Sequence, residues 1–208
     1  MVSNILLLNG STRINGNSLN ICNAIKEILS KEGKDTEIIS IQRAFNNNEF
    51  NSLENAIRSS DIIGIVSPLY VDTFPYPVLA FLEAMENKYI DDLSEKGFFV
   101  IGQCNFPESR RIDPLIRSGK CFCNKVNMRW LGGLSYGGAI RIESKALDKA
   151  GKEGERISRA LESAMKEITS GNTISDKSKR LFKNDVNKIL YRPFIWGANI
   201  MFRRMKNK

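Results

Sequence analysis

Short runs of consecutive apolar residues alternate along the chain with segments in which apolar positions recur every three or four residues. Such runs are typical of strands that are buried on both faces, as in a parallel sheet, where no side of the strand meets water. The predicted strands are Asn4–Leu8, Thr36–Ile41, Asp61–Val66, Phe98–Gly102 and Met128–Leu134.

The segments between these strands have helical length and carry helix signals. The first, Ser18–Lys31, has apolar side chains along one face and is followed by Gly33, a residue type that commonly ends helices. A polar stretch at residues 46–51 predicts a loop, and residues 171–176 predict a break before the C-terminal segment. The other predicted helices are Leu53–Ser59, Pro77–Asn87, Pro114–Asn124 and Lys145–Thr169.

Strands and helices that alternate in this way predict an α/β domain, with a parallel sheet covered by helices on both faces. The apolar pattern alone does not order the strands within the sheet. It does locate a ligand site, because ligands of open α/β sheets bind in the crevice beyond the carboxyl ends of the strands. Functional residues are therefore expected in the loops after the first, third, fourth and fifth strands.

The length and the charge distribution divide the chain into two parts. The 208 residues are enough for one domain with a full hydrophobic core, which is expected over residues 1–170. The net charge of +8 lies in residues 171–208, which hold ten Lys or Arg and two Asp. This part is predicted to be a basic, amphipathic helical extension. It docks on its own domain, forms a dimer contact or lies against an anionic surface such as a membrane, and no nucleic-acid partner is expected.

The composition excludes several kinds of chemistry. The chain has no histidine, so neither a Ser-His-Asp triad nor an imidazole metal ligand is available. Its four cysteines, including the C-x-C pair Cys121 and Cys123, lack the spacing of an iron–sulfur site and are expected to be reduced thiols without a metal. The first apolar run, Ile5–Leu8, is too short for a signal sequence or a membrane span, so a cytoplasmic location is expected. Without histidine, any reaction must use other side chains or be carried by a cofactor.

The loop after the first strand, residues 9–19, has the composition of a phosphate site. Gly10 and Gly16 allow close backbone approach, Arg13 adds positive charge, and N–H groups at the start of the next helix point into the loop. The loop lacks the lysine of a P-loop and the G-x-G-x-x-G dinucleotide fingerprint. The alternative is a plain loop in which Asn or Ser caps the helix. The candidate hydroxyl donors are those of Ser11, Thr12 and Ser18.

The segment GSTRINGNSLNI, which starts at Gly10, resembles the G-S-x-R-x-x-G-N-[ST] phosphate loop of the flavodoxin-like NAD(P)H-dependent FMN reductases and related flavoproteins. Ser11, Arg13, Asn17 and Ser18 fall on the pattern, and Thr12 occupies its variable site. The resemblance implies that this loop wraps the ribityl phosphate of FMN. It also implies a three-layer α/β/α flavodoxin-like fold, with a five-stranded parallel sheet in the order 2-1-3-4-5.

The loop after the third strand, residues 67–83, has apolar and aromatic side chains that a flat ring could pack against. Two prolines bracket a turn that presents Leu69, Tyr70 and Val71, and a planar tricyclic ring needs apolar or aromatic surface of this kind. The alternative is a proline-rich surface connection. The segment that begins at Pro68 is similar to the family's [TS]-P-x-Y loop, which implies contact with the isoalloxazine ring of FMN.

The loops after the fourth and fifth strands supply further candidates. Gln103 and Asn105 are expected to hydrogen-bond the pyrimidine side of a flavin. A glycine-rich segment indicates close backbone approach at Gly137, and Tyr136 is expected to stack near the ligand. Leu19, at the start of the first helix, completes the predicted cofactor-binding set.

By this resemblance the protein is an FMN-dependent oxidoreductase, which passes electrons from NADH or NADPH through bound FMN to a small-molecule acceptor. FMN carries the chemistry, so no catalytic side chain is predicted. Members of the family are often dimers, and a homodimer is expected. The alternative is a flavodoxin-type electron carrier without nicotinamide turnover. Such carriers are usually strongly acidic, whereas residues 1–170 hold equal numbers of basic and acidic residues.

Overall fold

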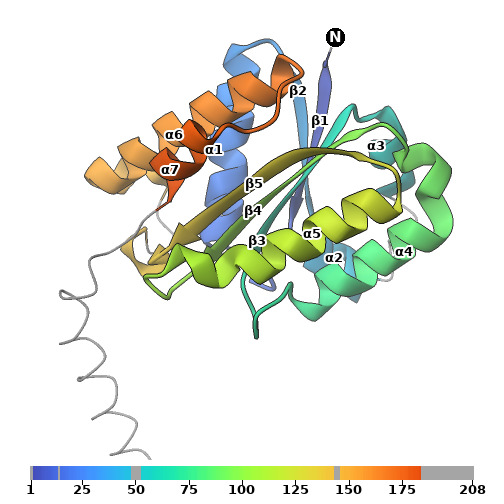
Figure 1. The fold of residues 1–208 in the computed structure, drawn as a ribbon, viewed down its shortest axis with the longest axis horizontal. Coiled ribbons are helices and arrows are strands. Elements are labelled where there is room, and N and C mark those ends of the chain that lie inside the picture. Colours follow the sequence, from blue (N-terminus) through green and yellow to red (C-terminus); the bar gives the residue numbers. More distant parts are fainter. Residues whose placement is uncertain (1, 14, 48–52, 143–145, 184–208) are drawn as a thin grey trace, which may run out of the picture.

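The computed structural model describes residues 2–13, 15–47, 53–142 and 146–183. Five parallel strands form one sheet in the order β2-β1-β3-β4-β5 (Figure 1), which confirms the predicted fold and strand order. The strands are β1 (Asn4–Asn9), β2 (Asp35–Ser40), β3 (Ile62–Pro68), β4 (Gly97–Cys104) and β5 (Arg129–Gly137).

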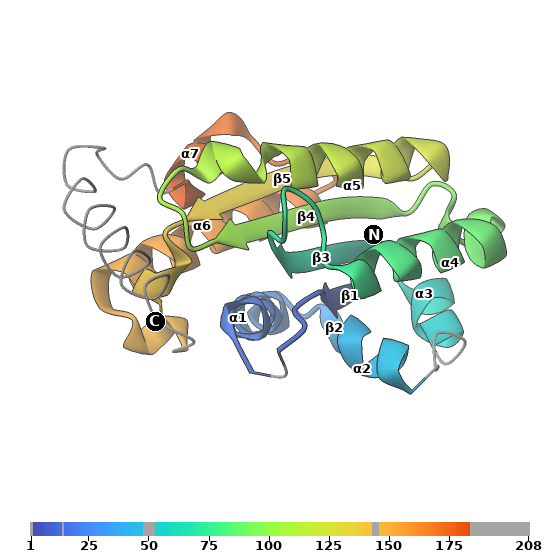
Figure 2. The same ribbon diagram turned by 90° about the horizontal axis from the view of Figure 1, so that it is seen from below.

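Helices cover both faces of this sheet and complete the three layers (Figure 2). Helices α1, α6 and α7 pack on one face, and α2, α3, α4 and α5 pack on the other. Their bounds are α1 (Asn17–Lys31), α2 (Ile41–Asn46), α3 (Glu54–Ser59), α4 (Tyr76–Leu93), α5 (Asp113–Lys125), α6 (Gly151–Thr169) and α7 (Asp176–Phe182). Three short 3₁₀ turns are also described: η2 (Ser109–Ile112), η3 (Ala139–Arg141) and η4 (Leu147–Lys149).

Alternating side chains of β1 pack into the two hydrophobic cores, one on each face of the sheet. Ile5 and Leu7 pack into the core under α1 and α6, whereas Leu6 and Leu8 pack into the core under α4 and α5. All four are buried, and full burial of one such side chain contributes about 1.5–3 kcal/mol. The uninterrupted apolar run in the sequence therefore reflects a strand that is covered on both faces.

Three helix boundaries differ from the sequence prediction. Residues 41–46 form α2 rather than a strand end and loop, because the Ser40 hydroxyl accepts a hydrogen bond from the Arg43 amide and caps a helix there. Helix α4 continues to Leu93, past a non-helical Tyr89. Helix α6 begins at Gly151, whose φ of 59° is left-handed, and not at residue 145.

The described part of the C-terminal extension belongs to the folded domain. The Ile174 amide donates to the Leu131 carbonyl of β5 at 2.7 Å, and Phe182 of α7 is fully buried in the core under α6. The domain therefore continues to residue 183. The rest of the predicted amphipathic extension, and most of the predicted loop at residues 46–51, lie outside the described residues. Within the described ranges, no helix has both the length and the apolar content needed to cross a bilayer.

Candidate functional site

Strands β1, β3 and β4 end at the same edge of the sheet, and a cavity of about 130 Å³ opens there. Three loops surround it, one after each of these strands. None of the residues that line the cavity is acidic, so the surroundings favour an anionic or neutral polar ligand. The lining residues are Ser11, Arg13, Gly16, Asn17, Pro68, Leu69, Tyr70, Gln103, Cys104 and Asn105.

The loop after β1 is fixed by hydrogen bonds close to its own backbone. The Gly10 amide donates to the Val66 carbonyl of β3 at 2.9 Å, which ties the start of the loop to the sheet. The Ser11 amide donates to Asn9 Oδ1, and the Arg13 amide donates to Ser11 Oγ, both at 3.1 Å. Short polar side chains form tight turns in this way. These hydrogen bonds hold residues 9–13 in a tight turn against the sheet.

The N-terminus of α1 fits a phosphate group. Gly16 is its N-cap, so no side chain caps the first turn, and that turn contains no acidic residue. Among the described residues, a Cβ atom at Gly16 would find only Ser11 Oγ at 3.9 Å and Arg13 Cβ at 4.0 Å, so this α-carbon faces the hollow of the loop. Uncapped N–H groups and the positive end of the helix dipole are suited to an anion.

The loop after β3 closes a second side of the cavity with a two-residue turn. Tyr70 and Thr73 exchange backbone hydrogen bonds at 2.9 and 3.0 Å, and Val71 and Asp72 between them have φ values of 46° and 61°. Val71 is 97% exposed, although it is apolar and β-branched residues strain in the left-handed region. Such strain is typical of loops that are held in place for a function. The Tyr70 hydroxyl lies 3.0 Å from Thr12 Oγ1 of the phosphate loop.

The end of β4 forms the third side. The Gln103 carbonyl accepts from the Leu69 amide at 2.8 Å, and Gln103 Nε2 donates to Ser18 Oγ of α1 at 3.4 Å. Cys104 lies beside it, 6% exposed, and burial raises the pKa of its thiol. Asn17 Nδ2 donates to the Ala139 carbonyl at 2.8 Å, so the loop after β5 also supports the start of α1.

The structure brings most of the predicted residues together. Thr12 borders the cavity through Tyr70, and Ser18 lies behind Gln103, where it is buried. The sequence interpretation missed two residues of the site. Asn9 could have been found, because an Asn at the end of a buried strand is a signal for an Asx turn. Cys104 was interpreted only as a small buried side chain. The predicted residues that line the cavity are Ser11, Arg13, Asn17, Pro68, Leu69, Tyr70, Gln103 and Asn105.

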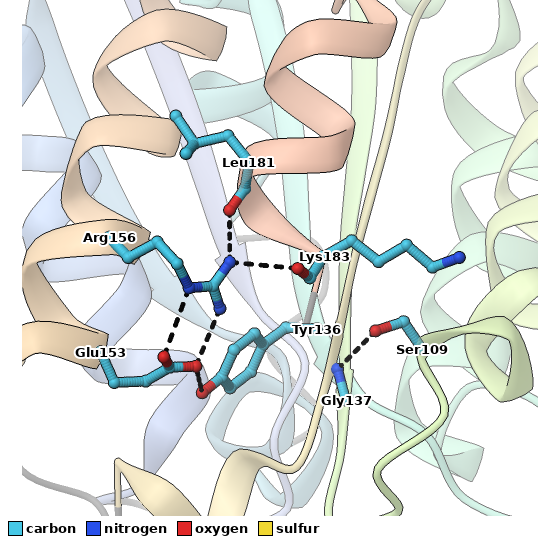
Figure 3. Close-up of polar contacts among 7 residues, drawn as sticks. All are labelled: Ser109, Tyr136, Gly137, Glu153, Arg156, Leu181 and Lys183. Atoms are coloured by element: carbon cyan, nitrogen blue, oxygen red, sulfur yellow. Dashed lines mark hydrogen bonds and ion pairs between the residues drawn. The ribbon is translucent and has the colours of Figure 1, made fainter. Parts of the chain in front are cut away.

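Tyr136 does not stack over this cavity, contrary to the expectation from the sequence. Its side chain is fully buried on the α6 side of the sheet, with its ring centroid 5.8 Å from that of Phe182. Its hydroxyl donates to Glu153 Oε1 at 2.8 Å, and burial raises its pKa (Figure 3). The alternation of strand side chains sends this residue into the core.

Two other predicted residues lie away from the cavity. The Gly137 amide donates to Ser109 Oγ at 3.1 Å, and a Cβ atom there would lie 2.6 Å from the Pro107 carbonyl oxygen (Figure 3). Gly137 therefore lets the loop after β4 approach β5 closely. Leu19 lines a separate hollow beside the end of β2, together with Arg43.

The fold defines the class of the protein: a flavodoxin-like α/β domain. Residues 3–102, which are 100 of the 208 residues, match the family model of NADPH-dependent FMN reductase. This match supports an FMN-dependent enzyme that takes electrons from a nicotinamide. The matched segment holds β1 to β3, most of β4 and the first two loops of the site. A search of curated protein sequences gives no match.

Solved structures with the same fold include flavin oxidoreductases and a flavodoxin. The apo form of an NADH:FMN oxidoreductase (EMOB) has a TM-score of 0.61 at 12% identity, and the match covers 90% of this chain and 98% of that one. FerB, a flavoenzyme NAD(P)H:(acceptor) oxidoreductase from Paracoccus denitrificans, has a TM-score of 0.50 at 13% identity over 62% and 75% of the two chains. A cysteine-to-alanine mutant of flavodoxin from Pseudomonas aeruginosa has a TM-score of 0.53 at 14% identity over 78% and 99%. At these identities the likeness concerns the fold alone.

Proposed function

We propose that FMN binds in the cavity between the loops after β1, β3 and β4, and that the enzyme uses NADH or NADPH to reduce a small acceptor there. The observation that carries this proposal is the uncapped N-terminus of α1, which opens into a hollow beside Arg13 and the Ser11 hydroxyl. These groups suit a phosphate and leave the other two loops for the rest of the cofactor.

Each loop then has a separate task. Ser11, Arg13 and the α1 amides hold the phosphate, Leu69 and Tyr70 offer a flat apolar surface to the ring, and the polar groups of Gln103 and Asn105 orient it. When bound, FMN supplies the electron transfer between nicotinamide and acceptor. The described side chains contribute binding and orientation, so no side-chain acid or base is assigned.

We further propose that a second copy of the chain covers the open side of the site. The cavity of about 130 Å³ is smaller than the pockets of about 300–1,000 Å³ that enclose small ligands, so the ring would lie partly outside it. Apolar side chains that follow the carboxyl ends of the strands are exposed, and interfaces commonly use such side chains. They are Val71, Tyr76, Phe106 and Ile140.

The compartment and the acceptor belong to the same proposal. All four cysteines are free thiols, which favours a reducing compartment such as the cytoplasm. The acceptor in this proposal is a small molecule, as the resemblance of the loops to those of FMN reductases implies. Membrane contact through the basic C-terminal extension stays a prediction.

The binding proposal is tested by comparing FMN with riboflavin, which lacks the phosphate. The protein is titrated with each flavin, and quenching of flavin fluorescence gives the dissociation constant. We expect FMN to bind more tightly than riboflavin. Arg13→Gln should weaken FMN binding about 10- to 100-fold, as expected for a lost charged hydrogen bond, and leave riboflavin unchanged.

Arg43→Gln is the matched control, since Arg43 is exposed near the same end of the sheet but does not line this cavity. It should change neither affinity. Equal affinities for FMN and riboflavin, or an equal loss of both in Arg13→Gln, would contradict a phosphate at the start of α1.

Turnover separates the enzyme from an electron carrier. The FMN-loaded protein is mixed with NADH or NADPH and with a quinone or free flavin, and oxidation of the nicotinamide is followed. Sustained oxidation is expected. Absence of turnover with every acceptor, in a protein that binds FMN, would support the carrier.

A further inference from the structure

A second and larger cavity, of about 420 Å³, lies along the outer edge of β5. This strand is the last in the sheet order, with α5 on one face and α7 on the other (Figures 1 and 2). None of the residues that line this cavity, called the β5 groove below, borders the candidate FMN cavity. The β5 groove is therefore a separate site.

Positive charge surrounds the β5 groove. Arg117 and Lys120 come from α5, Lys179 comes from α7, and Lys183 follows α7, whereas Asp113 is the one acid in the lining. Arg117 and Lys120 are exposed and form no ion pair with a described residue. Lys179 is paired with Asp176 at 3.1 Å, but cations still outnumber acids around this concavity, so it attracts anions from solution.

The walls of the β5 groove are held in fixed positions. Arg156 of α6 donates to the Leu181 carbonyl and, at 3.1 Å, to the Lys183 carbonyl, which fixes the end of α7 (Figure 3). The Ser175 hydroxyl accepts from the Ser178 amide at 3.2 Å and caps the start of α7. The cations of α7 are therefore carried by a helix that is anchored at both ends.

The floor of the β5 groove has room for a compact ligand rather than an added strand. Gly132 is buried against Ile174, and Ile116 packs against Gly133. The space of the groove therefore lies beside this stretch of β5, next to the half-buried Trp130. The Leu131 carbonyl is already taken by the Ile174 amide, which closes one end of the strand edge to a long peptide. A volume of about 420 Å³ falls in the range of about 300–1,000 Å³ that is usual for small-molecule sites.

We propose that the β5 groove binds a small phosphorylated ligand of nucleoside-diphosphate size. The cations from α5 and α7 hold its phosphates from two sides, and Trp130 offers a surface to a flat base. This site needs neither FMN nor nicotinamide, so it does not depend on the function proposed above.

The test uses ADP and pyrophosphate as probes and Trp130 as the reporter. The chain has two tryptophans, so Trp196→Phe leaves Trp130 as the sole indole and serves as the parent protein. Titrations are run with and without saturating FMN, at about 0.15 M salt, where surface charges are screened beyond about 8 Å. We expect saturable binding of ADP at one site per chain by calorimetry, a change in Trp130 fluorescence, and no effect of FMN. Pyrophosphate should bind the same site more weakly and change the fluorescence less.

The variant Arg117→Gln/Lys120→Gln should weaken ADP binding at least tenfold, because two charged contacts are lost. Its matched control is Lys26→Gln/Lys152→Gln, which removes two exposed charges on α1 and α6 and should leave the affinity unchanged. The proposal is overturned if ADP does not bind, if both double variants weaken it equally, or if FMN displaces it. Binding to anionic vesicles without binding of ADP would likewise overturn it in favour of a membrane contact.

Discussion

The hydroxyl oxygens of Thr12 and Tyr70 lie 3.0 Å apart and join the phosphate loop to the turn after β3. The turn is itself strained, with Val71 and Asp72 both at positive φ. The hydrogen bond therefore holds the strained turn in a fixed position beside the loop at the start of α1. In the proposed complex, the surface for the ring and the site for the phosphate move as one unit.

Tyr70→Phe should weaken FMN binding about three- to tenfold, because it keeps the ring and removes one neutral hydrogen bond. Thr12→Val should have a similar effect, and the double variant should lose little more than either single one, since both remove the same bond. Flavin fluorescence titration measures these constants. Tyr76→Phe, which changes an exposed ring hydroxyl outside the cavity, is the control. Fully additive losses would show that the two hydroxyls act independently.

Gly10 and Gly16 lie in the same loop but have different surroundings. A Cβ atom at Gly10 would lie 2.9 Å from Val78 Cγ2 and 3.0 Å from Ser67. Gly10→Ala should therefore lower the free energy of unfolding by about 1–3 kcal/mol, measured in urea, and Val78→Ala in the same chain should restore part of it. Gly16→Ala should change stability by less than about 1 kcal/mol but weaken FMN binding, because its methyl group enters the phosphate hollow. A stable Gly10→Ala protein would contradict the close packing of this loop.

The layers of the fold were predictable because the strands that form them are uninterrupted apolar runs. The same strands place the loops after β1, β3 and β4 at one edge, so Ser11, Tyr70 and Gln103 were expected at one site and all line one cavity. The strand order came from the family resemblance, because an apolar run does not show which strand lies beside it.

The errors arise where a single tertiary contact decides the outcome. Ser40 can end a strand or cap a helix, and it caps α2. The sequence placed Tyr136 in the loop after the fifth strand, but β5 extends to Gly137, so strand alternation and the contact with Glu153 of α6 decide where its ring lies. The β5 groove joins residues of α5 and α7 that are about 60 positions apart, and no local pattern predicts it.

The four thiols should react at very different rates with a disulfide reagent. Cys121 is exposed, whereas Cys22 and Cys123 are fully buried and burial raises the pKa of Cys123 to about 11. We expect one fast thiol, which Cys121→Ser removes. Cys104 should react slowly because burial raises its pKa, and FMN should slow it further, since it lines the candidate cavity. Mass spectrometry of the modified peptides identifies each site. If FMN left the rate at Cys104 unchanged, the cofactor would have to bind elsewhere.

Glu153 should make the stability of the domain depend on acid pH. Burial alone would raise the pKa of this carboxyl group, but hydrogen bonds from Arg156 and Tyr136 outweigh it and hold the pKa below the ordinary value of 4.5. A carboxylate with a lowered pKa in the folded state stabilises the protein fully above its unfolded value. That stabilisation is lost as the pH falls from about 4.5 through the folded pKa.

Glu153→Gln should therefore lower the free energy of unfolding at neutral pH. Between neutral and acid pH, the free energy of unfolding should fall by less in this variant than in the unchanged protein. Urea unfolding at a series of pH values measures both effects. Glu155→Gln, which alters an exposed carboxylate two residues away, should leave the pH profile as it was. Asp61 and Glu167 also have lowered pKa values, so a slope of reduced size remains in Glu153→Gln. An unchanged slope in that variant would mean that Arg156 holds α6 and α7 together through the Leu181 and Lys183 carbonyls, without help from the Glu153 charge.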